Sequence, residues 1–307
     1  MTYSIVAIDR EAGQMGVAVQ SHYFGVGALV AWARPGIGVV ATQSVVRAAY
    51  GPDLLDALAE GARPDEALTH QVASDSGAAV RQVAVLDAAG RVAVHTGGAC
   101  IPSAGHVTGD GFGVQANLVA APAVWLEMRD VFLASTGTLA DRMLDALDAA
   151  ESAGGDLRGR QAAALRVVTT SSTGDLAADT VVDVRVDDSA EPLGELRRLV
   201  RASKALSGLV RLLAEPGLLS GAMTASPGIV DAALDELSLA QEILGDANGE
   251  PSAWSGLLLA RLGRTDAAAE HFAAARRRGL DPAPLLRSLS AAGMWPHDLD
   301  GLLRLAS

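Results

Sequence analysis

Residues 2–20 read TYSIVAIDREAGQMGVAVQ, and this stretch decides the fold because it predicts two strands joined by a turn. The runs 3–9 and 16–20 are rich in β-branched and apolar residues, which favours strands. Between them, residues 10–14 are polar and include a glycine, as a hairpin turn does. The chain therefore opens with a β-hairpin.

A second pair of apolar runs follows at residues 28–33 and 38–43, separated by Arg34-Pro35-Gly36. Proline followed by glycine is a strong turn signal. We therefore expect four strands within the first 43 residues, arranged as one antiparallel meander.

The rest of the first two thirds of the chain adds helices and further hairpins. Helical patterns begin at Pro52 and Pro64, strands return at 82–87 and 91–95, a helical region at 121–150 follows, then strands at 163–169 and 181–186 and a helix at 192–204. This order lacks the regular strand–helix alternation of a parallel sheet. We expect an α+β fold in which two antiparallel sheets pack together with helices outside, an αββα sandwich.

The last third of the chain carries helical patterns only, which predicts an all-helical module at 205–307 after a domain at 1–204. Trp254, Leu262-Gly263, Phe272 and Pro282 echo one tetratricopeptide unit, whereas a solenoid needs about three units for stability. We therefore expect a helical hairpin that packs on the main domain or on a partner subunit, with Trp254 and Phe272 in its core.

Composition excludes several classes of protein. The 307 residues carry a net charge of −12, whereas phosphate binding needs clustered lysine and arginine, so we expect no nucleic-acid partner. The single cysteine, Cys100, excludes an internal disulfide framework. The N-terminal stretch has no basic segment and no long apolar run, and no membrane-length apolar run follows. We expect a cytoplasmic protein without a membrane partner.

Standard metal, cofactor and nucleotide motifs are missing from the sequence. The histidines are His22, His70, His95, His106, His271 and His297. Their spacing contains no HExxH pattern and no cysteine partner, so we expect no metal and no cofactor. Glycines alternate over residues 109–113 without a strand–turn–helix context, which argues against a nucleotide loop. Cys100 has no evident base beside it and is typical of a small buried hydrophobic residue.

Thr2 offers a different kind of chemistry. Methionine is generally removed before a small residue such as threonine, and removal of Met1 would leave a free α-amine beside the Thr2 hydroxyl. An N-terminal amine is a recognised base for a threonine nucleophile, and its pKa of about 7.7–8.0 suits that role. Thr2 alone could therefore supply both nucleophile and base, although many proteins begin with Met-Thr.

Ten short stretches together resemble a known family. They are 2–7 (TYSIVA), 16–21 (GVAVQS), 38–43 (GVVATQ), 50–52 (YGP), 81–83 (RQV), 95–97 (HTG), 104–106 (AGH), 114–117 (VQAN), 159–161 (GRQ) and 183–188 (DVRVDD). The chain resembles, over about residues 2–199, the bacterial N-terminal-nucleophile-hydrolase-like (Ntn-hydrolase-like) family called domain of unknown function 1028. The resemblance implies the αββα sandwich of amide hydrolases but names no substrate. Similar members often carry a C-terminal helical region labelled as peptidoglycan-binding, and Ala116 stands where the family pattern has glycine.

The resemblance turns four residues into candidates for catalysis. Thr2 would attack a carbonyl, and Ser4 would lie on the same strand face because side chains alternate along a strand. Ser4 would either bond the Thr2 amine or be structural. Gln115 and Asn117 carry N–H donors suited to a developing oxyanion.

Five further residues are candidates for substrate binding. Ser21, Thr42 and Gln43 end neighbouring predicted strands and would line the same cleft. Arg81 or Arg160 would hold a substrate carboxylate with a bidentate guanidinium. The alternative for both arginines is a structural ion pair with a nearby aspartate, for which the sequence offers Asp9, Asp183 and Asp187.

Two functions remain open from the sequence. The first is an amidohydrolase that cleaves a small amide or peptide-like bond through an acyl-enzyme on Thr2. The second is a non-catalytic binding protein on the same scaffold, in which the helical module recruits a partner. A cysteine hydrolase using Cys100 is a third option, and a homodimer is compatible with each.

Overall fold

The computed structural model describes residues 2–215, 217–219, 221–294 and 298–307. Met1 and His297, both named in the sequence predictions, lie outside these residues. The chain divides into two compact units, residues 1–200 and 201–307. The division falls inside helix α7 (Pro192–Ala214), slightly before the boundary that the sequence predicted.

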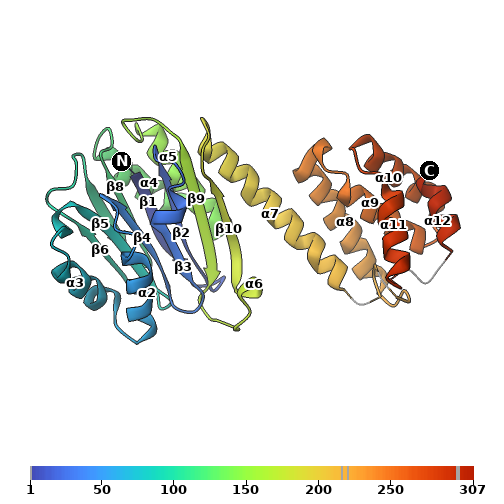
Figure 1. Cartoon of the computed structure of the whole chain (residues 1–307), viewed down its shortest axis with the longest axis horizontal. Coiled ribbons are helices and arrows are strands. Elements are labelled where there is room, and N and C mark those ends of the chain that lie inside the picture. Colours follow the sequence, from blue (N-terminus) through green and yellow to red (C-terminus); the bar gives the residue numbers. More distant parts are fainter. Residues whose placement is uncertain (1, 216, 220, 295–297) are drawn as a thin grey trace. The chain divides into compact units, whose positions relative to one another are not determined.

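The first unit contains two antiparallel sheets (Figure 1). The larger sheet has the strand order β10-β9-β2-β1-β8-β7 and the smaller has β3-β4-β5-β6. The strands are β1 (Thr2–Asp9), β2 (Gln14–Ser21), β3 (Ala31–Arg34), β4 (Gly38–Ser44), β5 (Arg81–Asp87), β6 (Val92–Thr96), β7 (Gly105–Gly109), β8 (Phe112–Asn117), β9 (Ala162–Thr169) and β10 (Thr180–Val186). The predicted α+β sandwich of two antiparallel sheets is confirmed.

Helices cover the outer face of each sheet. Helices α4 (Ala123–Ala134) and α5 (Leu139–Ser152) pack on the larger sheet, and α2 (Tyr50–Ala59) and α3 (Pro64–Ser74) pack on the smaller one. One apolar layer lies between each sheet and its helices, and a further apolar layer lies between the two sheets. A strand contributes to two of these layers because its side chains alternate: Ile5 of β1 faces the helices, and Val6 faces the other sheet.

The predicted four-stranded meander is wrong. Strands β1 and β2 belong to the larger sheet, whereas β3 and β4 belong to the smaller one. The free edge of β2 pairs with β9, which lies far along the chain, so β3 cannot pair there. The short helix α1 (Gly27–Val30) carries the chain between the sheets, and it occupies the start of the strand that the sequence predicted at 28–33.

The alternating glycines at residues 109–113 form the turn of the β7–β8 hairpin, an element that the sequence analysis did not predict. Gly111 has a φ of +75°, a backbone conformation that residues other than glycine rarely adopt. A strand and not a helix follows this turn, whereas a nucleotide-binding glycine loop leads into a helix.

The second unit is helical. It contains the end of α7 and α8 (Pro227–Leu244), α9 (Glu250–Arg261), α10 (Thr265–Arg277), α11 (Pro282–Ala291) and α12 (Leu299–Ala306). Trp254 and Phe272 lie in its core at 6% and 0% exposure, as predicted. The second unit also contains the 3-10 turn η2 (Gly245–Ala247), and the first unit contains the short helix α6 (Leu176–Asp179) and the 3-10 turn η1 (Ala78–Val80).

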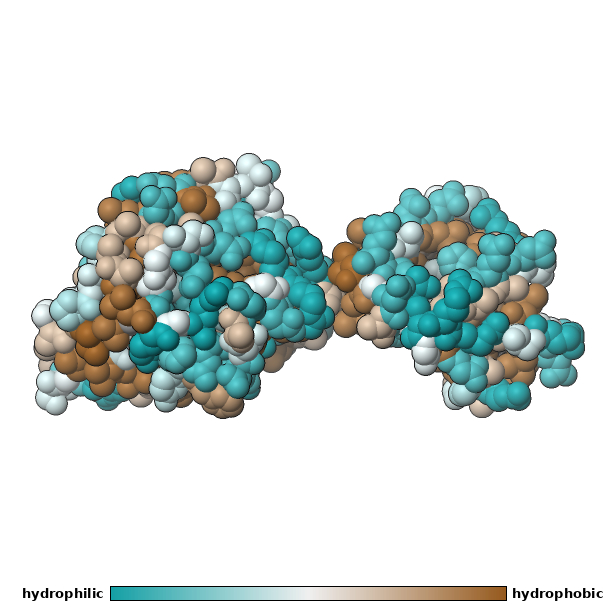
Figure 2. Space-filling model, turned by 90° about the horizontal axis from the view of Figure 1, so that it is seen from above, coloured by the Kyte–Doolittle hydropathy of each residue, from teal (hydrophilic) through white to brown (hydrophobic). Residues whose placement is uncertain are grey.

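The surface of each unit is mixed in character. Hydrophilic residues cover much of the visible face of both units, with hydrophobic groups scattered among them (Figure 2). Among the described residues, every helix is too short or too polar to cross a bilayer.

Packing of α5 on the larger sheet is tested by Leu147→Ala. Leu147 is fully buried between this helix and the sheet, so the variant should lose about 2–5 kcal/mol of unfolding free energy in chemical denaturation. Leu133→Ala on α4 is the matched control: this leucine is 60% exposed, and its loss should change the free energy by less than about 0.5 kcal/mol. Equal effects would contradict the assignment of this core.

Candidate active site

A cluster of polar side chains lies at one end of the space between the sheets. It consists of Thr2 and Ser4 on β1, Ser21 on β2, Gln43 on β4, Gln82 on β5, and Gln115 and Asn117 on β8. None of these residues is more than 6% exposed. Farther along, strands β1, β2, β4 and β5 carry apolar residues at their inward positions, so the polar groups gather at one end of the strands.

Strand register brings the members of this cluster together. Thr2 stands opposite Asn117, Ser4 stands opposite Gln115, and these pairs join β1 to β8. Gln43 stands opposite Gln82 in the other sheet. Each pair projects inward because it is in phase with apolar residues of the inter-sheet layer.

Gln82 joins the two sheets at the centre of the cluster. Its Oε1 accepts hydrogen bonds from Gln43 Nε2 (2.8 Å) and Asn117 Nδ2 (3.0 Å). Its Nε2 donates to Ala116 O at 2.9 Å, with Thr96 Oγ1 and Gly105 O at 3.0 and 3.1 Å. The sequence analysis missed Gln82 as a site residue, although its phase with apolar Ala84 and Leu86 marks it as inward-facing.

Ala116 lies outside the polar cluster. Its side chain lies in the core between the larger sheet and the helices, and only its carbonyl reaches Gln82.

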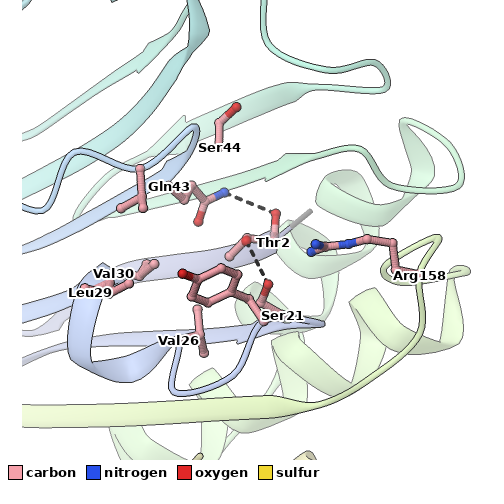
Figure 3. A pocket seen from close by; sticks show the side chains of 10 residues that line it. Thr2, Ser21, Val26, Leu29, Val30, Gln43, Ser44 and Arg158 are labelled. Carbon is pink, nitrogen blue, oxygen red and sulfur yellow. Dashed lines mark hydrogen bonds between the residues drawn. The ribbon is translucent and has the colours of Figure 1, made fainter.

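Thr2 is fixed from both sides. Gln43 Nε2 and Asn117 Nδ2 donate to the Thr2 carbonyl at 3.2 and 3.4 Å. The Thr2 hydroxyl donates to Ser21 Oγ at 3.1 Å (Figure 3). These contacts hold the backbone and the side chain of the first residue of β1 in one orientation.

The other two candidates for catalysis, Ser4 and Gln115, lie two residues away from Thr2 and Asn117 along their strands. Ser4 Oγ donates to Gln43 Oε1 at 2.7 Å. Gln115 Nε2 donates to Ser4 Oγ (3.2 Å) and to Ala41 O (3.0 Å). Gln115 and Asn117 therefore use their amide donors on groups of the protein, and both residues lie outside the lining of the adjacent pocket.

A small pocket opens beside Thr2. Its volume is about 90 Å³, which suits a few water molecules or a substituent of a few heavy atoms. Its polar lining consists of Thr2, Ser21, Gln43, Ser44 and Arg158, and its apolar lining consists of Tyr23, Val26, Leu29, Val30 and Val46. In Figure 3, Arg158 lies on one side of Thr2, and Val26, Leu29 and Val30 lie on the other.

A buried carboxylate orients the arginine of this pocket. Asp156 has a fully buried side chain, and Arg158 Nε and Nη2 donate to it at 3.3 and 3.2 Å. Asp156 also accepts from the backbone N–H groups of His22 and Arg158, both at 2.9 Å. Sequence patterns gave no signal for this pair, because its loop has no periodicity.

Backbone strain marks the same end of the sandwich. Ser44 and Leu118 have φ values of +73° and +54°, and they are the non-glycine residues with positive φ among those described. Ser44 ends β4 beside the pocket, and Leu118 directly follows Asn117. Such conformations cost about 1–3 kcal/mol each and gather at functional sites.

Three of the predicted binding residues lie elsewhere. Thr42 alternates with Gln43 and so faces the α2 side, where its hydroxyl donates to Arg47 O at 3.3 Å. Arg81 pairs with Asp75 at 2.9 Å, and Arg160 pairs with Glu191 and Glu151 at 2.5 and 3.4 Å. Both arginines thus form ion pairs, with partners other than the three aspartates that the sequence analysis named.

Other chemically active groups lie outside the pocket. Cys100 is buried, and its Sγ donates to Arg81 O at 3.2 Å. Tyr3 faces the helices, and burial, followed by the charge of Glu151, raises its pKa well above the usual value. Within the described part of the chain, no three His, Cys, Asp or Glu side chains are grouped to hold a metal ion.

Residues 2–196 match the model of a protein family described as a family of unknown function, DUF1028. The chain belongs to the DUF1028 family. A crystal structure of a DUF1028 protein from Silicibacter pomeroyi is similar, with 31% sequence identity and a TM-score of 0.62 over 69% of this chain and 90% of that one. No curated protein matches the sequence. The DUF1028 match includes every residue of the polar cluster and of the pocket.

Replacing the central amide tests the polar cluster. Gln82→Leu should lower the unfolding free energy by about 2 kcal/mol or more, because it removes one of the two acceptors that the buried amides of Gln43 and Asn117 each use. The control is Gln71→Leu, whose amide makes an exposed bond to Asp53 and should matter by less than about 0.5 kcal/mol. Chemical denaturation measures both, and a neutral Gln82→Leu would refute a structural role for the network.

The ion pair of Arg81 predicts a pH dependence of stability. Hydrogen bonds from Arg81 and from Gly77 N–H lower the pKa of Asp75 to about 2, against about 3.9 in an unfolded chain. Since the folded pKa is the lower one, the ionised Asp75 stabilises the fold above about pH 4, and this contribution is lost as pH falls toward about 2.

Comparison with Asp75→Asn measures that contribution. The stability difference between the wild type and the variant should be constant from about pH 5 to 7 and should shrink between about pH 4 and 2. A difference that does not change over the acidic range would show that Asp75 has an ordinary pKa.

Proposed function

We propose that this chain is an Ntn-type amidohydrolase in which Thr2, once residue 1 is removed, attacks the carbonyl of a small amide. The observation that carries the proposal is the position of the Thr2 hydroxyl: it lies at the wall of a pocket, held by Ser21, at the start of the central strand β1. Backbone fixed by Gln43 and Asn117 holds that hydroxyl ready for attack.

The choice of base follows from what surrounds the hydroxyl. The described lining of the pocket contains no carboxylate and no imidazole, and the only lysine of the sequence, Lys204, belongs to the other unit. A freed α-amine on Thr2 would therefore be the base.

The reaction would proceed through an ester on Thr2. The amine takes the hydroxyl proton as Oγ1 bonds to the substrate carbonyl carbon, and it returns the proton to the departing nitrogen as the C–N bond breaks. Water then cleaves the ester by the same proton path and restores the hydroxyl. Ser21 holds Oγ1, while Ser4 and Gln115 support Gln43 and the neighbouring strand from behind.

A second function is favoured by a groove in the helical unit. The groove has a volume of about 500 Å³, and its lining includes Gln241, Asp246, His271, Arg277 and Arg278. Charged and amide groups of this kind suit a polar peptide, so the helical unit would recruit a partner through such a segment. A folded chain in which Thr2 never becomes acylated would leave this partner-binding role as the better proposal.

The nucleophile is tested by substitution and by mass spectrometry of the intact chain. We expect active protein to lack residue 1 and to hydrolyse some members of a panel of small N-acyl p-nitroanilides. Thr2→Ala should reduce kcat/KM by about 10³-fold or more, and Thr2→Ser should retain part of the activity because a hydroxyl and an amine remain.

Thr42→Ala is the matched control, since this threonine directly precedes Gln43 in β4 and has its hydroxyl on the outer face of the sheet. It should leave kcat/KM within about twofold of the wild type. Active protein that retains Met1, or a fully active Thr2→Ala variant, would exclude the mechanism.

A further inference from the structure

We propose that the substrates are N-acyl amino acids with a short apolar acyl group, whose free carboxylate is held by Arg158. This proposal deepens the amidohydrolase function above and rests on it for the position of the scissile bond. The juxtaposition that carries it is an apolar wall and an oriented guanidinium on opposite sides of Thr2 (Figure 3).

The apolar side of the pocket limits the acyl group. Its most buried residues, Val26 and Val30, are 1% and 4% exposed, whereas Tyr23 is 51% exposed. Four of its five residues are aliphatic, so a charged or strongly polar substituent would lose hydration beside Val26 and Val30 without a partner. With a pocket of about 90 Å³, the wall suits an acyl chain of a few carbons, such as isobutyryl.

The opposite side of the pocket carries the group that recognises an anion. Asp156 engages the Nε and Nη2 atoms of Arg158, which fixes the plane of the guanidinium. A fixed planar fork recognises a carboxylate by geometry as well as by charge. A carboxylate presents two oxygens and a negative charge to this fork, so its hydrogen bonds there are stronger than those of a neutral carbonyl group.

Accessibility decides which half of the substrate carries the carboxylate. The side chain of Arg158 is 39% exposed, whereas Val26 and Val30 on the apolar side are almost fully buried. After the C–N bond breaks, the acyl group must stay on Thr2 and the amine must leave. The acyl half therefore lies toward Val26 and Val30, and the departing amino acid lies beside the more exposed Arg158.

Equilibrium binding to the Thr2→Ala chain tests this without requiring turnover. The ligands are N-isobutyrylglycine, the neutral N-isobutyrylglycinamide, and N-isobutylsuccinamic acid, which places the carboxylate on the acyl half. Calorimetry should show N-isobutyrylglycine binding about tenfold or more tightly than either of the others. Arg158→Gln in the same background should remove this preference, and Arg158→Lys should restore part of it.

Arg160→Gln is the matched control, because Arg160 lies two residues along the same loop and pairs with Glu191 and Glu151 outside the pocket. It should leave the preference unchanged, and thermal unfolding checks that each variant is folded. Equal binding of the acid and the amide, or tighter binding of the succinamic acid, would overturn the proposal. Selective binding together with no hydrolysis by the wild type would support this substrate class and overturn the amidohydrolase function instead.

Discussion

The site depends on two hydrogen bonds that the side-chain amides of Gln43 and Asn117 donate to the carbonyl of Thr2. Gln43 belongs to the smaller sheet and Asn117 to the larger one, and both amides also donate to Gln82 Oε1. Buried amides of this kind are costly unless every donor finds an acceptor. These hydrogen bonds therefore fix how the two sheets meet at this end, where the Thr2 hydroxyl lies at the pocket.

The same constraint explains the division of the inter-sheet layer. Apolar side chains such as Val6 and Leu86 fill most of it and supply non-directional cohesion. The polar end gives directional contacts that the apolar part cannot give, and the left-handed backbone of Ser44 and Leu118 lies at the ends of its strands. A rigid scaffold thus carries a small, strained and oriented site, as is common for sites that perform chemistry.

Much of the architecture was predictable from the sequence because strand and helix periods are local properties. The first hairpin, the helices beginning near Pro52 and Pro64, and the core positions of Trp254 and Phe272 follow from such periods. Which strands pair is decided by residues far apart, so the pairing of β2 with β9 could not be predicted from the order of the elements.

The site was predictable in part for the same reason. Ser21 and Gln43 were found because they end apolar strands, and Gln82 could have been found from its position at the start of one. Thr2 was found by its chemistry, because removal of Met1 would leave a free amine beside its hydroxyl. Thr42 cannot share a cleft with Gln43, since neighbouring residues of a strand face opposite sides. Arg158 and Asp156 belong to an irregular loop, so no period marks them and only the folded chain brings them to Thr2.

The central claim is that the hydroxyl of Thr2, beside its own freed amine, becomes acylated. Its most direct measurement is an acid quench of the wild-type chain during turnover of an N-acyl substrate, followed by mass spectrometry of its proteolytic peptides. We expect the acyl mass on a peptide that begins at Thr2. An acyl group on Cys100 or any other residue, or on no residue while turnover continues, would contradict the claim.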